Sequence, residues 1–463
     1  MRARRPLLAL VGLALAGCAL KSPPERSDLA KEALPNFQVP PAWTAQPGAG
    51  GAIQSGWLAA FDDPQLDNLV REVLASNPDL QIAAARVEQA ASLVKVAGAT
   101  LYPQVTALAR GGGALSGDSS GLEGAGIFAN WELDLWGRVR AGRASARDQY
   151  GSAALDYEYA RQSLAALAAK SWFLATEARL QKMNAEEMAA ASEKQLGFAN
   201  DRLRVGRGDE YDVALARATL ATFRDSVQSL DLAYRQSVRA LEALAGRYPA
   251  AALSVPAQLA ALPGPVPVGM PSELLERRPD VIAAERRVAA AFYRVEEAKA
   301  ARLPRISLTA AVTSISSELF VLKDRDNPVW SAGASLTAPL FLGGQLQAQV
   351  EVRTAEQKQA LAEYGRVGSR AFGEVENALS TAFTLDAREA ILRDAVVDNG
   401  RALELANVRF RVGAGDLRAV QQQSLALHAA RTALLRVQTE RLVQRVNLHL
   451  ALGGGFEGTA QKQ

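Results

Sequence analysis

The residue types that most often form catalytic or metal sites are scarce in this chain. It contains two histidines, His428 and His449, and one cysteine, Cys18. Both histidines fall in one expected helix, where they lie about 30 Å apart along the axis, too far for one metal ion to bind both. We therefore interpret them as residues on the face of a helix. With four methionines and a single cysteine, the composition gives no specific indication of soft-metal export.

Glycine-rich stretches are a second pattern that could support chemistry, because glycine loops can bind phosphate groups. The runs at 111–113 and 121–126 lack the order of strand, glycine loop and helix that a nucleotide site requires. The run at 453–455 follows an expected helix and is typical of its end. No Ser/His/Asp or Cys/His arrangement has support. The sequence therefore predicts no catalytic residues, no metal site and no cofactor, and we do not expect an enzyme.

The charge balance argues against one class of partner. The chain has 52 Lys and Arg against 49 Asp and Glu. Three of the basic residues, Arg2, Arg4 and Arg5, lie in an expected signal peptide, so the mature chain has 49 against 49. A chain without net charge gives no support to nucleic-acid binding.

The N-terminus is typical of an exported lipoprotein. Residues 1–17 form a charged start and a short apolar core, which is a signal peptide rather than a membrane span. The core ends in Leu15-Ala16-Gly17-Cys18, which resembles the lipobox of bacterial lipoproteins and implies lipidation of Cys18. Ala19 replaces the aspartate that in such lipoproteins favours the inner membrane, so we expect outer-membrane sorting. Residues 18–56 are then a lipid-anchored tether, extended over its segment rich in Pro, Gly and Ala.

One long stretch determines the architecture. Residues 138–204 contain no proline and are dense in Ala, Leu, Glu, Gln and Arg, so we expect a helix of about 100 Å. It ends where Gly206 and Gly208 permit a reversal and Asp209 can cap the next helix. That second helix spans 209–247. Helices of this length indicate an elongated molecule, because helices in globular domains average about three turns.

A hairpin of strands is expected at 103–136. The residues of 127–136 alternate between an apolar face and a mostly polar one, residues 103–110 form a weaker strand, and 111–126 form a turn. A soluble hairpin packed on one side is the alternative to a membrane sheet. Aromatic residues could mark the membrane interface: Tyr102, Trp131, Trp136, Trp330 and Phe341.

The arrangement then repeats about 201 to 207 residues later. Asn77-Pro78-Asp79-Leu80 returns as Arg278-Pro279-Asp280-Val281, and the glycine reversal before Asp209 returns before Asp416. The chain is therefore a tandem duplication, with a first repeat at 57–253, a proline-rich linker at 254–271, a second repeat at 272–455 and a tail at 456–463. In the second repeat we expect a hairpin at 305–341, a long helix at 343–411 and a shorter one at 416–452.

Four strands per chain cannot close a membrane barrel, because the smallest barrels have about eight. An open sheet edge is not tolerated in lipid, so the chain must oligomerise. The apolar spacing of the long helices indicates lateral packing into a hollow cylinder. The expected fold class is mainly α, with a membrane β-barrel portion continuous with a long helical barrel.

Five motifs together resemble the outer-membrane factors of tripartite efflux pumps, the TolC-type channel-tunnels, in their NodT-like and OprM-like lipoprotein branch. The resemblance implies a homotrimer in the outer membrane of a Gram-negative bacterium, with a barrel of about twelve strands. It also implies a tunnel through the periplasm that docks to a membrane-fusion adaptor and an inner-membrane transporter. We expect the transporter to be of RND type. The motifs are Phe61-Asp62-Asp63-Pro64-Gln65-Leu66, Trp131-Glu132-Leu133-Asp134-Leu135-Trp136-Gly137-Arg138, Arg277-Arg278-Pro279-Asp280-Val281, Leu303-Pro304-Arg305-Ile306-Ser307-Leu308-Thr309 and Ala451-Leu452-Gly453-Gly454-Gly455.

The two glycine reversals are the periplasmic tips by this resemblance, and they are expected to dock the adaptor. Aperture candidates are Arg204, Asp212, Arg411, Ala419 and Gln422. Arg204, Arg207 and Arg411 could form interhelical ion pairs that hold the aperture shut. Relatives commonly carry an acidic ring after the second tip, where this chain has alanine and glutamines, so we expect weaker cation selectivity. The docking residues are Val205, Gly206, Gly208, Asp209, Val412, Gly413, Gly415 and Asp416.

Two alternatives to an efflux channel remain. A tunnel for type I protein secretion would use the same fold with a different transporter. A lipid-anchored periplasmic coiled-coil scaffold would explain the helices, but it would not need four amphipathic strands. The transported substrate cannot be read from the sequence, because selection takes place largely upstream of the tunnel.

Overall fold

A computed structural model describes residues 21–45, 51, 53, 55–110, 123–316 and 329–457. The chain divides into two compact units, and each draws on both halves of the tandem repeat. The first unit comprises Met1–Phe37, Ala84–Asp156 and Asp280–Gly368. The second comprises Gln38–Ala83, Tyr157–Pro279 and Ser369–Gln463. The signal peptide and Cys18 lie outside the described residues.

The helices agree closely with the sequence predictions. The two long helices, α5 and α9, have 67 residues each. None of the helices in the described ranges is long and apolar enough to cross a membrane. The helices are α2 (Arg26–Ala33), α3 (Pro64–Ser76), α4 (Pro78–Ala99), α5 (Arg138–Arg204), α6 (Glu210–Leu244), α7 (Leu274–Arg277), α8 (Pro279–Ala300), α9 (Gln345–Arg411) and α10 (Leu417–Ala451), with short 3-10 turns at Ala59–Phe61 and Pro271–Glu273.

Two helical predictions need correction. Helix α6 ends at Leu244, before the expected 247, because Gly246 adopts a positive φ of 70° and reverses the chain. The tether was expected to be extended between residues 22 and 50, but Arg26–Ala33 forms helix α2. This short helix is held by tertiary contacts: Arg26 forms an ion pair with Glu285 at 2.6 Å, and Leu29 is buried.

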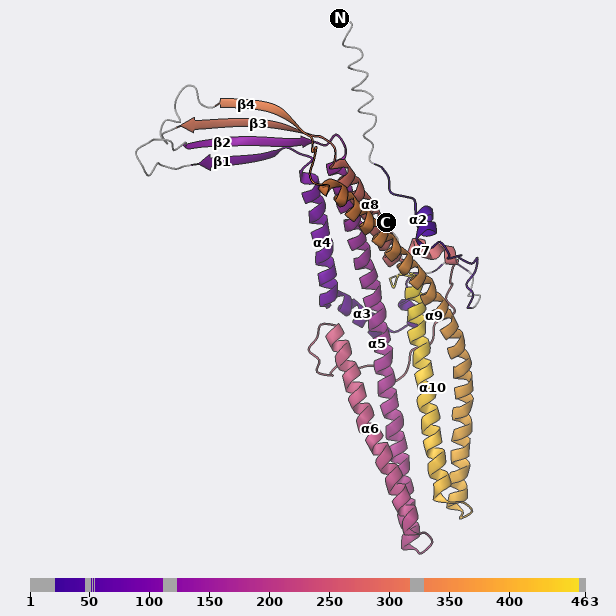
Figure 1. The fold of residues 1–463 in the computed structure, drawn as a ribbon. Coiled ribbons are helices and arrows are strands. Elements are labelled where there is room, and N and C mark those ends of the chain that lie inside the picture. Colours follow the sequence, from indigo (N-terminus) through magenta and orange to yellow (C-terminus); the bar gives the residue numbers. More distant parts are fainter. Residues whose placement is uncertain are drawn as a thin grey trace. The chain divides into compact units, whose positions relative to one another are not determined.

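The first unit contains one antiparallel sheet of four strands in the order β1-β2-β3-β4. Figure 1 shows the strands side by side, with α4, α5, α8 and α9 joined to one end of the sheet. The strands are β1 (Gln104–Arg110), β2 (Glu123–Leu133), β3 (Arg305–Ser316) and β4 (Val329–Thr337).

Three expected strand boundaries were wrong. Strand β2 begins at Glu123, inside the expected turn, and ends at Leu133 rather than Trp136. It ends there because Asp134 turns back to cap helix α5. Strand β4 ends at Thr337, before the end of the expected hairpin at 341, and Pro339 follows two residues later. A proline has no N–H for pairing, so the strand does not continue through it.

The second unit contains a large hydrophobic core. Helix α3 and the chain before it pack on a stretch of α5 in which Ala165, Ala166, Ala168 and Ala169 are fully buried. These small side chains let large ones approach the helix closely. The indole of Trp172 donates to the carboxylate of Asp63 at 2.8 Å.

Candidate membrane sheet and helical tips

The strand register gathers the apolar residues of all four strands on one face of the sheet. Two rows across the strands illustrate this arrangement: Val105–Ala129–Ala310–Ala332 and Ala107–Ile127–Val312–Trp330. A third row, Leu133–Ile306–Leu336, lies at the end of the sheet that joins the helices. The expected alternation in β2, β3 and β4 is therefore confirmed as one continuous surface rather than four separate patterns.

The opposite face carries more polar residues. Its rows include Gln104–Asn130–Thr309–Gly333 and Glu132–Ser307–Ser335. Apolar Leu108, Phe128 and Val329 also lie on this face. The sheet therefore offers one face suited to lipid and one suited to water.

The apolar face is uncovered within the first unit. The side chains of Val105, Ile127, Trp330 and Leu336 are all more than half exposed. Strands β1 and β4 are the edges of the sheet, so each has one side of backbone groups without a strand partner in the described chain. Such a sheet is unstable alone in water and needs both a lipid environment and further strands.

Side chains of the motif 131–138 join the sheet to helix α5. The carboxylate of Glu132 accepts hydrogen bonds from the guanidinium of Arg138 at 2.8 to 3.1 Å. The carboxylate of Asp134 accepts the backbone N–H groups of residues 139 and 140 and so caps the helix. Gly137 has a φ of 76°, which glycine adopts without strain. These contacts account for the acidic residues of the motif.

The expected interface aromatics divide into two groups. Two indole N–H groups make internal bonds: Trp131 donates to the Leu101 carbonyl at 3.0 Å and Trp136 to the Pro304 carbonyl at 2.6 Å. Tyr102, Trp330 and Phe341 are between 68% and 87% exposed. All five residues lie in the first unit, which contains the sheet. Their placement at a membrane interface stays a prediction.

The two glycine reversals have the same local geometry. Gly206 and Gly413 have φ values of 68° and 81°, and the helices before them end with backbone bonds across the turn. The Asp209 carboxylate accepts the N–H of residue 212, and the Asp416 carboxylate accepts the N–H of residue 419, both at 2.8 Å. The predicted caps are confirmed. A Cβ at Gly208 or Gly415 would lie 3.0 Å from an arginine side chain, which explains the second glycine of each turn.

The two tips are joined by contacts that the sequence did not predict. Arg418 donates to the Tyr211 hydroxyl at 3.1 Å, and its guanidinium lies 5.6 Å from the centre of the ring. Arg202 donates to the Phe410 carbonyl at 3.1 Å and lies over its ring. Tyr211 and Arg418 occupy equivalent positions in the two repeats, two residues after each capping aspartate. This equivalence of position is the feature of the sequence from which the contact could have been predicted.

The aperture candidates of the two tips differ from one another in their contacts and burial. Arg204 pairs with Asp201 of its own helix, and among the described residues the side chains of Arg207 and Arg411 make no hydrogen bond or ion pair, so the expected interhelical pairs do not form within one chain. Asp212 is half-buried, and burial together with the nearby carboxylates of Asp209 and Asp416 raises its pKa. The tips thus gather three carboxylates.

Two of the candidates on the second tip are exposed, Ala419 and Gln422. The neighbouring Gln421 is 3% exposed and faces the helix packing rather than solvent. Reduced cation selectivity stays a prediction, and reversal potentials in a planar bilayer measure it.

Replacing Arg418 with alanine is expected to favour an open aperture. The change removes the hydrogen bond and the cation–π contact to Tyr211, a loss of about 1 kcal/mol per copy. That loss shifts a closed-to-open equilibrium about fivefold for each copy, so single-channel current in a planar bilayer should rise. Arg411→Ala is the matched control, because Arg411 makes no hydrogen bond or ion pair in the described ranges. Equal currents for both variants would show that the Tyr211 contact does not restrain the tips.

The two histidines take part in packing. The ring of His428 lies edge-on against Phe223 at 5.3 Å, and burial lowers its pKa. The ring of His449 stacks on Trp57 at 5.9 Å, and burial, with a contribution from Arg445, lowers its pKa to about 4. The interpretation of both as helix residues holds, with the addition that His449 is buried and His428 is half-buried.

Acidification is expected to destabilise the second unit through His449. Above pH 6.5 the imidazole is neutral in the folded and the unfolded chain, so it contributes nothing to pH dependence. Between pH 6.5 and about pH 4 only the unfolded chain binds the proton, so stability falls as pH decreases. The melting temperatures at pH 7.5 and pH 5.0 should differ less for His449→Phe than for the native protein. The phenylalanine keeps the stacking on Trp57 but cannot bind a proton.

Comparison with known proteins identifies the family. A model of the outer membrane efflux protein family matches residues 69–247 and 270–454. The chain belongs to the outer membrane efflux protein family. It is an efflux channel protein of the outer membrane of a Gram-negative bacterium, and the two matched segments follow the two halves of the tandem repeat.

Individual members of the efflux protein family are similar over almost their whole length. The pyoverdine export outer membrane protein OpmQ of Pseudomonas putida is 30% identical over 473 residues, covering 98% of each chain. The cation efflux system protein CusC of Escherichia coli O6:H1 is 28% identical, covering 96% of this chain and 98% of CusC. The solved structure of the outer-membrane channel OprN superposes with a TM-score of 0.83 at 28% identity, covering 91% of this chain and 99% of OprN.

Proposed function

We propose that three copies of this efflux protein form a closed conduit. The observation that carries the proposal is the sheet register, which puts a continuous apolar surface on one face and leaves β1 and β4 as open edges. Pairing β1 of one copy with β4 of the next satisfies both edges and gives a barrel of about twelve strands. The apolar face meets lipid, and the more polar face lines a water-filled passage.

The helical tips are the proposed docking site for a periplasmic adaptor. Val205 and Val412 are 64% and 73% exposed at equivalent positions of the two tips. Exposed apolar residues on a rigid turn are typical of a protein contact. The docking set is the one predicted from the sequence: Val205, Gly206, Gly208, Asp209, Val412, Gly413, Gly415 and Asp416.

The proposed partner pump is an inner-membrane transporter of RND type. Similar proteins bear the names of pumps for toluene and antibiotics and of a cation efflux system, and these names support efflux rather than protein secretion. We also propose that Cys18 carries the lipid anchor. We propose that the chain catalyses no reaction, because packing against Phe223 and Trp57 accounts for both of its histidines.

The test is efflux in a Gram-negative host that lacks its own outer-membrane efflux channel. The full chain is expressed with and without a membrane-fusion adaptor and an RND transporter, and accumulation of a fluorescent dye is measured. Accumulation should fall only when all three proteins are present, and the Val205→Asp/Val412→Asp variant should lose the effect. The variant Leu232→Asp is the control, because this exposed leucine lies within α6, away from the turns.

An unchanged dye level with all three proteins would contradict the efflux proposal. Recovery of a secreted protein in the medium with an ATP-driven exporter, and no effect on dye, would favour the secretion tunnel. A loss of dye in cells that contain the chain alone would mean that the adaptor is not needed.

A further inference from the structure

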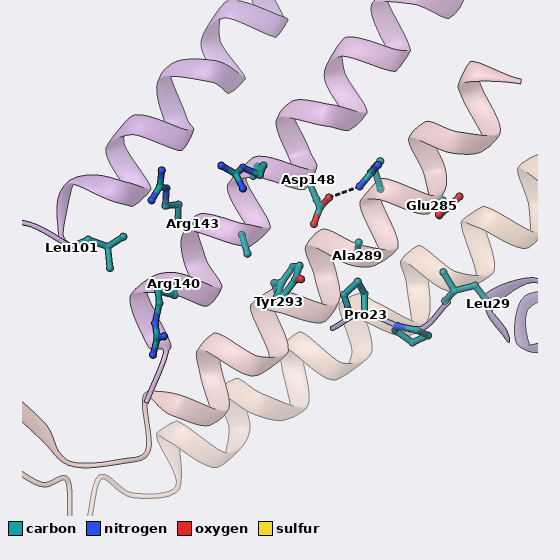
Figure 2. A pocket seen from close by; sticks show the side chains of 13 residues that line it. Pro23, Leu29, Leu101, Arg140, Arg143, Asp148, Glu285, Ala289 and Tyr293 are labelled. Carbon is teal, nitrogen blue, oxygen red and sulfur yellow. Dashed lines mark hydrogen bonds and ion pairs between the residues drawn. The ribbon is translucent and has the colours of Figure 1, made fainter. Parts of the chain in front are cut away.

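A cavity of about 470 Å³ lies in the first unit, between helices α5 and α8 and the N-terminal segment. Arg140, Arg143 and Arg147 line it from α5, and Arg286 and Tyr293 line it from α8. Figure 2 shows Arg140, Arg143 and Tyr293 around the cavity, with Asp148 on the same helix as the first two. Leu29, Leu101 and Ala289 supply apolar wall.

The positive charge of the cavity is only partly compensated. Its lining has four arginines against two acidic residues, a net charge of +2. Both acids are already paired: Asp148 with Arg286 at 3.2 Å, and Glu285 with Arg26 at 2.6 Å. Within the described ranges, the side chains of Arg143 and Arg147 make no hydrogen bond or ion pair. Two guanidinium groups at the cavity therefore have hydrogen-bond donors to offer a ligand.

The position of these arginines relates them to the membrane. Helix α5 begins at Arg138, five residues after β2 ends at Leu133. Arg143 and Arg147 lie one turn apart on one side of the helix, about 8 and 14 Å from its start. The last apolar row of the sheet, which contains Leu133, lies at that same end. With the apolar face of the sheet in lipid, as proposed above, the cavity is next to the boundary where lipid headgroups begin.

We propose that this cavity binds the phosphate of an anionic phospholipid headgroup. Guanidinium groups bind phosphate through paired hydrogen bonds, and two of them are available here. The hydroxyl of Tyr293 adds a donor at the same cavity, and burial raises its pKa, so it stays protonated. Free phosphate shares this chemistry, but the location beside the apolar row favours a lipid. The cavity lies in the first unit, whereas the helical tips belong to the second.

The experiment measures lipid binding to the full-length protein, purified in detergent from outer membranes. Native mass spectrometry counts lipids per chain during titration with phosphatidylglycerol, phosphatidylcholine or inorganic phosphate. We expect one phosphatidylglycerol per chain, with affinity reduced about tenfold or more in Arg143→Gln/Arg147→Gln. The matched control is Arg217→Gln/Arg239→Gln, which removes the same charge from exposed positions of α6 and should bind like the native protein.

Three results would overturn the proposal: equal affinity in the cavity variant and the native protein, equal affinity for phosphatidylcholine and phosphatidylglycerol, or displacement of the lipid by an equal concentration of inorganic phosphate. The last result would identify a site for free phosphate. If the double variant does not assemble, Arg143→Gln and Arg147→Gln are tested singly, and each should show a partial loss. Single variants with native affinity would contradict the proposal.

Discussion

Replacing Ala310 with arginine is expected to prevent assembly in the outer membrane. Ala310 lies in the row Val105–Ala129–Ala310–Ala332 of the apolar face, which is the face proposed to contact lipid. An arginine on the lipid face of a membrane sheet costs about 2 to 4 kcal/mol near the middle of the bilayer. In a closed trimer this cost arises once in each copy, which is enough to remove most of the assembled protein.

The matched control is Thr309→Arg, one residue away on the opposite face. Thr309 lies in the row Gln104–Asn130–Thr309–Gly333, on the face proposed to line the water-filled passage. Assembly should therefore be retained. The measurement is the amount of trimer in the outer-membrane fraction, by gel electrophoresis without heating. Equal behaviour of the two variants would mean that the faces are not divided between lipid and water.

Removing the guanidinium of Arg278 is expected to lower the free energy of unfolding of the second unit. Arg278 is 1% exposed, forms an ion pair with Glu374 at 2.6 Å and donates to the Ala451 carbonyl at 3.1 Å. Its guanidinium also lies 5.9 Å from the ring of Tyr159. Arg278→Ala leaves the carbonyl without this donor and a hole in the packing. We expect a loss of about 3 kcal/mol, below the upper range for fully buried pairs because Glu374 is partly exposed.

Arg370→Ala provides the comparison, because Arg370 approaches the same carboxylate of Glu374 at 3.6 Å but is 46% exposed. An exposed pair of this kind contributes about 0 to 1 kcal/mol. Unfolding of the two variants is followed by helical circular dichroism during heating in detergent. A smaller drop in melting temperature for Arg278→Ala than for Arg370→Ala would contradict the assigned role of the buried guanidinium.

The helices could be predicted closely because their ends are encoded locally. Asp209 and Asp416 cap the helices that follow them, and Gly206 and Gly413 supply positive φ at the turns. Helix α2 was missed because a helix of eight residues is not stable on its own in water, and the ion pair of Arg26 with Glu285 stabilises it from a distance.

The strand ends were less predictable, because pairing and capping decide them rather than alternation. Trp136 continues the alternating pattern of β2, but Asp134 already turns to cap α5. Contacts between distant segments lay beyond the sequence for the same reason. Arg418 and Tyr211 meet only when the two hairpins pack together, and the arginines of the cavity gather only when α5 and α8 are neighbours.

Single-particle imaging of the full-length protein, extracted from outer membranes in detergent, tests the central claim most directly. A closed trimeric conduit should give a particle with threefold symmetry, in which β1 of each copy pairs with β4 of the next and the closed sheet continues into a helical cylinder about 100 Å long. A monomer, or an oligomer in which the β1 and β4 edges stay unpaired, would contradict it.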